Sequence, residues 1–492
     1  MALSWFESVV LVLILLSFIY STWNSIYRRR NLPPGPIPLP IVGNVLHIKR
    51  GEMVKSLMEF KEKYGSVYTV HFGHYPTVVL CGYDTIKEAL IDRAEEFGAR
   101  GRLPTVDQYM KAHGIAFSNG DRWKDLRRFS LTILRNFGMG KKTIEERIQE
   151  EAQFLTAELR MQNKQFIDPT KFVVQGVSNV ICSIVFGDRF EYSNDSFQSL
   201  LGMFSAVNQD MSSSWGQMLD MMPSVMQFIP GPHKRINKSF ERLTDFIKER
   251  VKMNEETLDP NSPRDFIDCF LIKQRQEKDN PNFDRCNMLM TINNLFFAGT
   301  ETVSSTLRHG FMIIMRYPEV QAKLHEEIDR VVGESRVPNI EDRSKMPYTD
   351  AVIHEIQRFI DILPVNVPHA TTKDVNFKGY TIPKGTDVYP LLCSVHQDPT
   401  KLANPYKFDP NNFLDNKGGF KKHVTFMPFS AGKRVCVGEG LAKMELFIFF
   451  TTLLQNFRFV PETPLTDKDI EPMMAGFANM PKFYRMAFIP RV

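Results

Sequence analysis

The stretch Phe429-Ser430-Ala431-Gly432-Lys433-Arg434-Val435-Cys436-Val437-Gly438 places one cysteine in a glycine-rich loop, immediately before a helical pattern over Leu441–Leu454. Backbone N–H groups and the helix dipole lower the pKa of a cysteine in such a position and favour the thiolate. Gly432 and Gly438 would let the backbone approach a large planar partner closely, and Arg434 offers a fork to a carboxylate. For a cysteine taken alone, a buried structural thiol is the simpler interpretation.

The composition around this loop is that of a large globular protein. The chain has 492 residues, of which 43% are hydrophobic and 24% are charged. These values exclude a disordered, collagen-like or coiled-coil chain. A net charge of +5 is too small to predict nucleic-acid binding. The six cysteines contain no CxxC motif or close pair, which excludes a disulfide framework and a zinc ribbon. Apart from Cys436, we expect reduced and mostly buried thiols.

The N-terminus carries a targeting signal. Ser8–Tyr27 contains no charge and is followed by Arg28-Arg29-Arg30; twenty helical residues span about 30 Å, the thickness of the bilayer core. A cleaved leader, the alternative, would have basic residues before the apolar run, whereas only Glu7 precedes it. The sequence therefore predicts a signal-anchor helix and its basic flank over residues 1–30, with the N-terminus in the lumen and the rest in the cytosol.

A proline-rich hinge and one large domain should follow the anchor. Five prolines fall within Pro33–Pro40, so residues 31–40 should form a stiff extended spacer. No break in composition divides residues 41–492, which we expect to form a single domain, mainly α-helical with small β-sheets (α+β).

Local patterns indicate the main elements of that domain. A strand pair is predicted over Val67–Phe72 and Thr77–Cys81, turning at Gly73-His74, and later β segments near Val375–Thr381 and Phe457–Val460. Apolar residues spaced three and four apart predict long helices. These are Ile144–Met161, Phe240–Glu256, Asp284–Met315 and Tyr348–Ile360.

The helical stretch after Asp284 contains Ala298-Gly299-Thr300-Glu301-Thr302. A glycine inside a helix costs about 1 kcal/mol relative to alanine, so close approach by a cofactor or substrate would explain Gly299. Glu301 and Thr302 supply an acid and a hydroxyl that together can relay protons. A glycine-kinked core helix with an incidental threonine is the alternative.

Two further pairs share a helix face. Glu355 and Arg358 lie at i, i+3, where most such pairs are surface salt bridges worth a few tenths of a kcal/mol. Trp123 and Arg127 lie at i, i+4 and together suit an anionic planar ligand; a core tryptophan beside a solvated arginine is the alternative.

Taken together and in this order, these motifs resemble the cytochrome P-450 superfamily, and within it a microsomal family 2 member. The loop matches the family's haem-binding pattern Phe-x-x-Gly-x-Arg-x-Cys-x-Gly at every specified position. The resemblance implies a cytochrome P-450 fold and haem b as cofactor, with Cys436 as the proximal thiolate ligand of the iron. It also implies a set of haem propionate contacts, namely Arg100, Trp123, Arg127, His369 and Arg434.

The resemblance assigns the remaining motifs as well. Thr302 and Glu301 become the proton-delivery residues, and Glu355 and Arg358 become a buried pair linked to haem incorporation. Many members place Arg or His where this chain has Asn412 as that pair's third partner. The implied walls of the substrate pocket are Ile115, Phe117, Phe297, Ala298, Leu363, Val367 and Phe477, with the Val207–Gln209 region.

The implied reaction is insertion of one oxygen atom from O2 into a small apolar substrate such as a xenobiotic, steroid or fatty acid. The thiolate ligand favours O–O cleavage. No GxGxxG or flavin-site signature is present, so electrons from NADPH must arrive through a separate flavoprotein. The expected partners are a reductase and, as a second candidate, cytochrome b5, on the cytosolic face of the endoplasmic reticulum membrane.

Two surface segments complete these expectations. A basic face near the cysteine would dock the acidic partners, with ordinary solvated charge as the alternative; its residues are Arg122, Lys124, Arg127, Arg128, Arg135, Lys421, Lys422, Lys433 and Lys443. Met221–Pro232 is apolar and is expected to dip into the membrane. Two other functions stay open, a haem-thiolate isomerase or dehydratase and a non-catalytic, membrane-anchored haem or lipid carrier.

Overall fold

The computed structural model describes residues 31–137, 142–471 and 478–491, together with six single residues before position 31. The expected anchor over residues 1–30 therefore lies almost entirely outside the described residues. Within the part of the chain that is described, no helix is long and apolar enough to cross a membrane.

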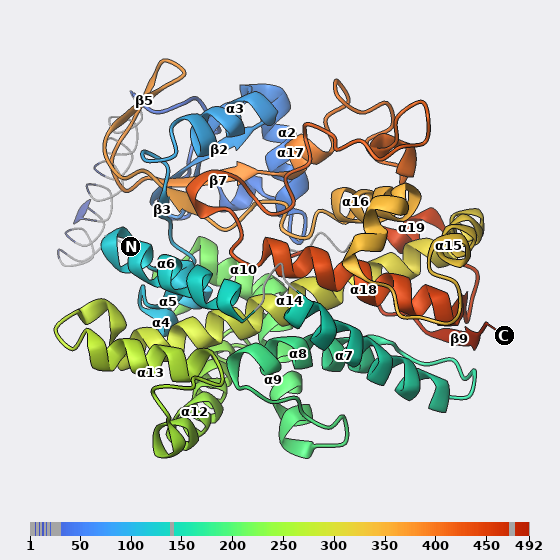
Figure 1. Cartoon of the computed structure of the whole chain (residues 1–492). Helices are drawn as coiled ribbons and strands as arrows, with labels where there is room; N and C mark the ends of the chain where they lie inside the picture. Colours follow the sequence, from blue (N-terminus) through green and yellow to red (C-terminus); the bar gives the residue numbers. More distant parts are fainter. Residues whose placement is uncertain are drawn as a thin grey trace.

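Most of the domain is a helical body built around one long helix, α14 (Arg285–Arg316), and a smaller β-rich part lies on one side of it (Figure 1). Helix α8 (Thr170–Val185) and the short helix α5 (Gly114–Phe117) pack directly on α14, and α18 (Glu439–Asn456) packs on α7 (Lys142–Met161). The other helices are α2 (Met53–Tyr64), α3 (Tyr83–Lys87), α4 (Pro104–Met110), α6 (Gly120–Asn136), α9 (Asp195–Ser212), α10 (Ser214–Met221), α11 (Pro223–Met226), α12 (Lys234–Thr257), α13 (Phe266–Gln276), α15 (Pro318–Val331), α16 (Pro347–Ile360), α17 (Cys393–His396) and α19 (Asp467–Ile470). Short helical turns are η1 (Val45–His47), η2 (Glu88–Asp92), η3 (Pro281–Phe283), η4 (Ile340–Lys345), η5 (Pro410–Phe413) and η6 (Gly432–Arg434).

The β-rich part contains a five-stranded sheet in the order β1-β2-β7-β4-β3. Its strands are β1 (Val67–Phe72), β2 (Tyr75–Cys81), β7 (Asp387–Leu391), β4 (His369–Ala370) and β3 (Ala99–Arg100). β1 and β2 form the predicted hairpin, β2 runs parallel to β7, and β4 is antiparallel to both of its neighbours. The β3–β4 pairing sets Arg100 opposite His369, two candidate site residues far apart in the sequence.

Two small hairpin-like sheets complete the β structure. β5 (Val375–Phe377) pairs with β6 (Tyr380–Ile382), and β8 (Phe457–Pro461) pairs with β9 (Met486–Pro490). The β segment predicted over Val375–Thr381 is therefore two strands, because Lys378 and Gly379 adopt positive φ and turn the chain between them.

The proline-rich segment contains no helix or strand over residues 33–38, as expected. It is attached to the domain, however: the Thr69 N–H in β1 donates to the Pro34 carbonyl at 2.8 Å. A Cβ on Gly35 would lie 1.9 Å from the Thr69 carbonyl oxygen, so only glycine permits this approach. The segment is thus an extended strap on the sheet rather than a free spacer.

All six cysteines are free thiols. Of the five outside the loop, Cys81, Cys182 and Cys393 are buried and Cys269 is half-buried, whereas Cys286 is exposed in the first turn of α14. These thiols are thus mostly buried, as expected, and Cys286 is the exposed exception.

Candidate functional site

The cysteine loop, α14 and the segment 363–367 enclose one cavity. The space between its walls totals about 1610 Å³, part of it open to solvent. Among the residues that line it are Arg100, Ile115, Trp123, Arg127, Ala298, Thr302, Leu363, Val367, Arg434 and Cys436.

Packing against η2 holds the cysteine loop in place. Gly432 has φ +69°, and a Cβ there would lie 1.6 Å from the Leu90 carbonyl oxygen. The conformational freedom of Gly432 therefore serves contact with the protein's own backbone, not the planar partner that the sequence suggested. Gly438 lines the cavity, and a Cβ on it would meet only the Cys436 sulfur at 4.0 Å. The Cys436 N–H donates to the Phe429 carbonyl at 3.0 Å and closes the loop.

The electrostatics of the Cys436 thiol differ from the sequence prediction. Cys436 is exposed on the cavity, yet the protein that encloses it raises its pKa above the ordinary value, because an enclosed site disfavours the charged thiolate. The Gly438 N–H, Arg127 and Arg100 act in the predicted direction, toward a lower pKa, but this enclosure outweighs them. A bound metal ion would replace the thiol proton outright.

Three guanidinium groups gather at the edge of the cavity. Arg434, only 4% exposed, donates to the carbonyls of Gly98 and Ser118 at 2.8 Å each and lies 3.9 Å from the Trp123 ring centroid. Arg127 donates to the Val435 carbonyl at 2.7 Å, which joins α6 to the cysteine loop. Arg100 donates to the carbonyls of Ala116 and Val367.

These guanidiniums have no acidic partner among the described residues, and the buried Nη1 of Arg434 has no hydrogen-bond partner there either. Burial, reinforced by mutual repulsion, lowers the pKa of Arg434 to about 8 and that of Arg100 to about 10. Such a cluster favours an anionic ligand, because a buried charge without a counter-charge is destabilising.

His369 lies beside the same cluster. Its Nδ1 is 2.8 Å from the Phe97 carbonyl oxygen, while its buried Nε2 has no partner in the described part of the chain. Burial lowers the pKa of His369 to about 3, so the ring is neutral; a carboxylate at Nε2 would raise that pKa. Unlike the three arginines, His369 is not among the residues that line the cavity.

A thiol in one wall, cationic groups along one edge and apolar side chains elsewhere suit a planar macrocycle that carries carboxylates. The apolar part of the lining includes Ile115, Leu295, Ala298, Leu363, Val367, Leu441 and Ala442. Haem has this combination of a metal centre, an apolar ring and two propionates, so the residues present fit it.

Helix α14 crosses the cavity with its Ala298–Thr302 segment. A Cβ on Gly299 would lie 2.5 Å from the Ile181 Cδ1, so this glycine allows close packing of α8, and it also lines the cavity. The Thr302 hydroxyl donates to the Ala298 carbonyl at 2.8 Å. Thr302 lines the cavity but Glu301 does not.

Glu301 faces α9 instead. It is 7% exposed and accepts a hydrogen bond from the Asn208 amide at 3.1 Å, while its Oε1 lacks a partner among the described residues. Burial raises the pKa of Glu301. The two residues expected to relay protons together therefore lie on different sides of α14.

Glu355 and Arg358 form a buried bidentate ion pair, with N–O distances of 2.7 and 2.6 Å. Arg358 also donates to three carbonyls, those of His396, Pro405 and Lys407. The Asn412 amide donates to Glu355 at 3.2 Å, so the residue that replaces the usual Arg or His still contacts the pair. Every N–H of the Arg358 guanidinium and both oxygens of Glu355 are used within the protein.

The remaining expected pocket residues are divided. Ile115, Ala298, Leu363 and Val367 line the cavity, whereas Phe117 and Phe297 pack against the main hydrophobic core. The Phe297 ring lies 5.8 Å from that of Phe204 and 6.3 Å from that of Phe240, measured between centroids. Phe477 lies outside the described residues.

Among the cavity residues that the sequence did not predict, one carries an ionisable group. Glu445 on α18 is 1% exposed and lines the cavity, and no hydrogen bond or ion pair within the described residues reaches its carboxyl group. Burial raises its pKa well above the ordinary value. The available signal was its position: Glu445 is the acidic residue directly before the uncharged, mostly apolar stretch Leu446–Leu454.

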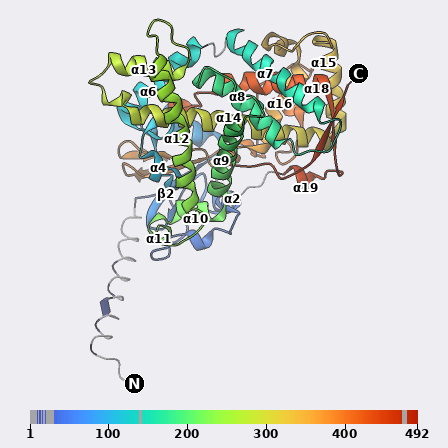
Figure 2. The same cartoon turned by 90° about the horizontal axis from the view of Figure 1, so that it is seen from below.

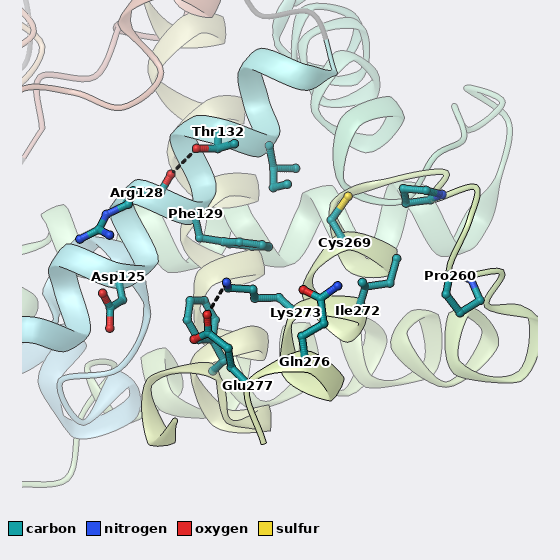
Figure 3. A pocket seen from close by; sticks show the side chains of 13 residues that line it. Asp125, Arg128, Phe129, Thr132, Pro260, Cys269, Ile272, Lys273, Gln276 and Glu277 are labelled. Carbon is teal, nitrogen blue, oxygen red and sulfur yellow. Dashed lines mark hydrogen bonds and ion pairs between the residues drawn. The ribbon is translucent and has the colours of Figure 1, made fainter. Parts of the chain in front are cut away.

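A second pocket lies between α6 and α13 (Figure 3). Phe129 and Ile272 contribute apolar walls, and the Lys273 ammonium pairs with Glu277. The pocket's thiol, Cys269, has its pKa raised to about 11 by burial. The pocket's lysine is paired, its thiol is held neutral, and its arginine, Arg128, is exposed rather than buried. This pocket therefore lacks the buried, unpartnered charges that mark the first cavity.

Comparison with known proteins agrees with this geometry. The cytochrome P450 family model matches residues 33–488. The chain belongs to the cytochrome P450 family. It is 53% identical to cytochrome P450 2G1 of Oryctolagus cuniculus over 471 residues, 95% of each chain. It is 55% identical to cytochrome P450 2A13 of Homo sapiens over 474 residues, 96% of each chain, and 52% identical to cytochrome P450 2F2 of Mus musculus over 460 residues, 93% of this chain and 94% of that protein.

The predicted resemblance to family 2 is thereby confirmed, and with it the class of chemistry. This P450 is a haem-thiolate monooxygenase that uses haem b, receives electrons from a redox partner reductase and oxidises small apolar substrates such as xenobiotics. The isomerase and carrier alternatives lose their support.

Proposed function

We propose that Cys436 is the proximal thiolate ligand of haem b in this monooxygenase, and that Arg100, Trp123, Arg127, His369 and Arg434 hold the haem propionates. The observation that carries the proposal is Arg434. Its guanidinium is buried on the wall that also holds Cys436, and its Nη1 has no partner in the described part of the chain. A propionate supplies both the missing acceptor and the missing negative charge.

The reduced, carbon-monoxide-bound difference spectrum tests the proposal. Thiolate-ligated haem should give a strongly red-shifted Soret band, and Cys436→His should abolish that band while haem remains bound. Absence of the band from folded, haem-loaded wild-type protein would remove Cys436 as the ligand.

Bound haem supplies the oxygen chemistry, because a thiolate ligand favours O–O cleavage. The protein's own contribution is a largely apolar cavity and a proton supply. Thr302 lines the cavity, with its hydroxyl donating to the Ala298 carbonyl, and Glu301 is the proposed proton donor, since burial raises its pKa and so favours the protonated form. Glu301 must turn from α9 toward the cavity to deliver that proton.

Substitution separates these roles. Thr302→Ala and Glu301→Gln should consume NADPH with less product formed per NADPH, because electrons still arrive while protons are misdelivered. Wild-type coupling in both variants would contradict the assignment.

We also propose that the reductase, and cytochrome b5 as a second candidate, dock beside the cysteine loop. Within the described residues, the expected basic face divides into paired and unpaired groups. Lys433 pairs with Glu95, Lys443 with Glu439 and Lys124 with Asp121. Ion pairs are absent there for four exposed members of the face, Arg128, Arg135, Lys421 and Lys422, and Figure 3 shows Arg128 pointing away from the Phe129 ring.

Unpaired charges attract an acidic partner more strongly than charges already neutralised by a neighbour. Arg128→Ala should therefore slow NADPH-driven turnover more than Lys433→Ala does, and leave peroxide-driven turnover unchanged in both variants. An equal loss of turnover with NADPH and with peroxide would contradict the docking proposal.

A membrane-bound location follows from the apolar surface together with the expected single-pass anchor over residues 1–30. Phe228 and Ile229, after α11, are 78% and 36% exposed, and Ile37 and Ile41 on the strap are 75% and 72% exposed. The two segments converge, because a Cβ on Gly73 at the β1–β2 turn would lie 3.6 Å from the Ile41 carbonyl and 3.5 Å from the carbonyl at the end of α10. Figure 2 shows α10, α11 and α2 on the same side of the molecule.

We infer that this surface rests on the endoplasmic reticulum membrane from the cytosolic side. In protein that lacks residues 1–30, Phe228→Asp with Ile229→Asp should reduce membrane binding. Membrane binding equal to that of the truncated wild-type protein would argue against this surface.

A further inference from the structure

Helices α10 and α4 lie side by side near the β-rich part (Figure 2), and one hydrogen bond joins them across a long sequence separation. The Thr105 N–H, in the first turn of α4, donates to the Asp220 carboxylate in α10 at 2.8 Å. An N–H in a first helical turn has no acceptor within its own helix, so Asp220 satisfies a group that would otherwise lack a partner.

The rest of α4 is held from other directions. The Leu103 N–H before it donates to Asp107 at 2.8 Å, within the same segment. Toward its other end, Gln108 accepts a hydrogen bond from the Asn237 amide at 2.9 Å and Tyr109 contacts Thr244, both in α12. The first turn of α4 therefore depends on Asp220 for its polar tie to α10.

This tie lies at a cleft that adjoins the haem cavity. The residues that line the cleft include Leu103, Gln217, Asp220, Met221, Val365 and Pro368. Leu363, Asn366 and Val367, in the same short segment, line the haem cavity. The cleft and the cavity thus share the wall 363–368, and separation of α4 from α10 would open the cleft along that wall.

The charges around Asp220 are unbalanced. Arg102 is engaged by Asp387 in β7 at 2.7 Å, which leaves Asp220 and Asp107 without a cationic partner among the described residues. The Tyr389 phenol, also in β7, faces the same carboxylates and is held neutral, because burial raises its pKa. Burial raises the pKa of Asp220 to about 7 and that of Asp107 to about 6.

Protonation of Asp220 weakens the charge-assisted bond to the Thr105 N–H, but it also relieves repulsion by Asp107 and removes the cost of keeping a charge buried. Burial is the largest of these effects, so the pKa of Asp220 lies above its ordinary value. The closed contact therefore binds the proton more tightly than a separated, hydrated Asp220 would, and deprotonation loosens the contact.

We propose that Asp220 is a positioning residue for ligand access in this P450: its carboxyl group holds the first turn of α4 against α10 and keeps the cleft beside the 363–368 wall closed. Loss of this contact speeds both association and dissociation of ligands. It leaves equilibrium affinity nearly unchanged, because Asp220 does not line the cavity itself.

Stopped-flow binding of a neutral phenyltriazole to the ferric full-length holoenzyme, followed at the Soret band, tests this inference. Asp220→Ala should raise the association and dissociation rates together, each by about 10-fold, the size expected for one lost hydrogen bond to a charged group. Gln108→Ala, the matched control, breaks the α4–α12 tie and should bind at the wild-type rate. Wild-type rates in Asp220→Ala, or an equal increase in Gln108→Ala, would overturn the proposal.

The pH profile supplies a readout that a purely structural role would not move. The wild-type association rate should rise as the pH rises through about 7, because deprotonation of Asp220 loosens the contact, and Asp220→Asn should flatten this rise. A rise that persists unchanged in Asp220→Asn would assign it to another acid and contradict the proposal. The inference uses the proposed haem site only for its optical signal, so failure of that site would appear separately, as a wild-type enzyme without the thiolate Soret band.

Discussion

Substitution of Gly432 by alanine probes how the fold holds the haem ligand. Two penalties are expected at this position. The first is conformational: φ is +69°, and an L-residue in this left-handed region costs about 1–2 kcal/mol. The second is steric, since the new Cβ would lie 1.6 Å from the Leu90 carbonyl oxygen, whereas ordinary contact begins at 3.4 Å. The difference, 3.4 − 1.6, requires the loop and η2 to separate by roughly 1.8 Å.

A separation of that size exceeds what the site can absorb. Functional groups must be held within about 0.5 Å of their working positions, and the obstacle is backbone rather than a flexible side chain. Arg434 and Cys436 follow Gly432 by two and four residues, so the displacement passes directly to the proposed propionate contact and iron ligand. We therefore expect Gly432→Ala to lose most of its thiolate-ligated haem.

A matched glycine isolates the steric penalty. Gly385 has φ +77° and no atom within 4 Å of the position its Cβ would take, so Gly385→Ala carries only the conformational cost. The assay is the carbon-monoxide difference spectrum per mole of purified protein, together with the midpoint of thermal unfolding. If Gly432→Ala matched Gly385→Ala in both measurements, the claim that contact with η2 fixes the loop would be refuted.

Three further predictions follow from buried groups of the same domain. Glu355→Gln should destabilise the protein by about 3–5 kcal/mol, because it leaves the Arg358 charge buried without its partner. Asn412→Ala, which removes one amide contact to the pair, should cost only about 0.5–1.5 kcal/mol; chemical denaturation compares the two. The wild-type protein should lose stability as the pH rises above 4.5, because the folded state binds the Glu445 proton more tightly than the unfolded state does. Glu445→Gln should abolish this loss. Thermal midpoints from about pH 6 to about pH 8 check the sign, and a parallel decline in both proteins would count against it. Arg434→Gln should reduce haem retention by about 10-fold, measured by transfer of haem to apomyoglobin, since one charged hydrogen bond is lost.

The sequence was informative where structure depends on local pattern. Alternating and β-branched residues predict β1 with its observed bounds, and the apolar periodicity predicts α14 to within one residue at each end. Membership of the cavity was predictable for residues in a matched motif, such as Cys436 and Arg434. Pairing of β3 with β4, which sets Arg100 beside His369, has no signal in either segment, because strand pairing is decided by tertiary packing.

Where the sequence predictions were wrong, they misjudged which way a side chain points, not which segment lies at the site. Consecutive residues on an α-helix point about 100° apart, so a motif that names Glu301 and Thr302 together cannot say that both face the cavity. Phe297 and Ala298 diverge for the same reason. A glycine likewise marks a close approach without naming the neighbour: at Gly299 the neighbour is Ile181, and at Gly432 it is Leu90.

Arg358 and Arg434 are both buried, but they differ in whether the protein itself supplies partners for the guanidinium group. Arg358 lies at 1% exposure with every donor engaged by Glu355 or by a carbonyl, so its network is complete within the protein and its role is to hold the fold. Arg434 is almost as deeply buried, yet no acid among the described residues faces it and one donor has no partner. A buried cation of the second kind destabilises the protein alone and is relieved by an anionic ligand. The same residue type in two buried sites is therefore structural in one and ligand-directed in the other, and unmet hydrogen-bonding capacity rather than burial distinguishes them.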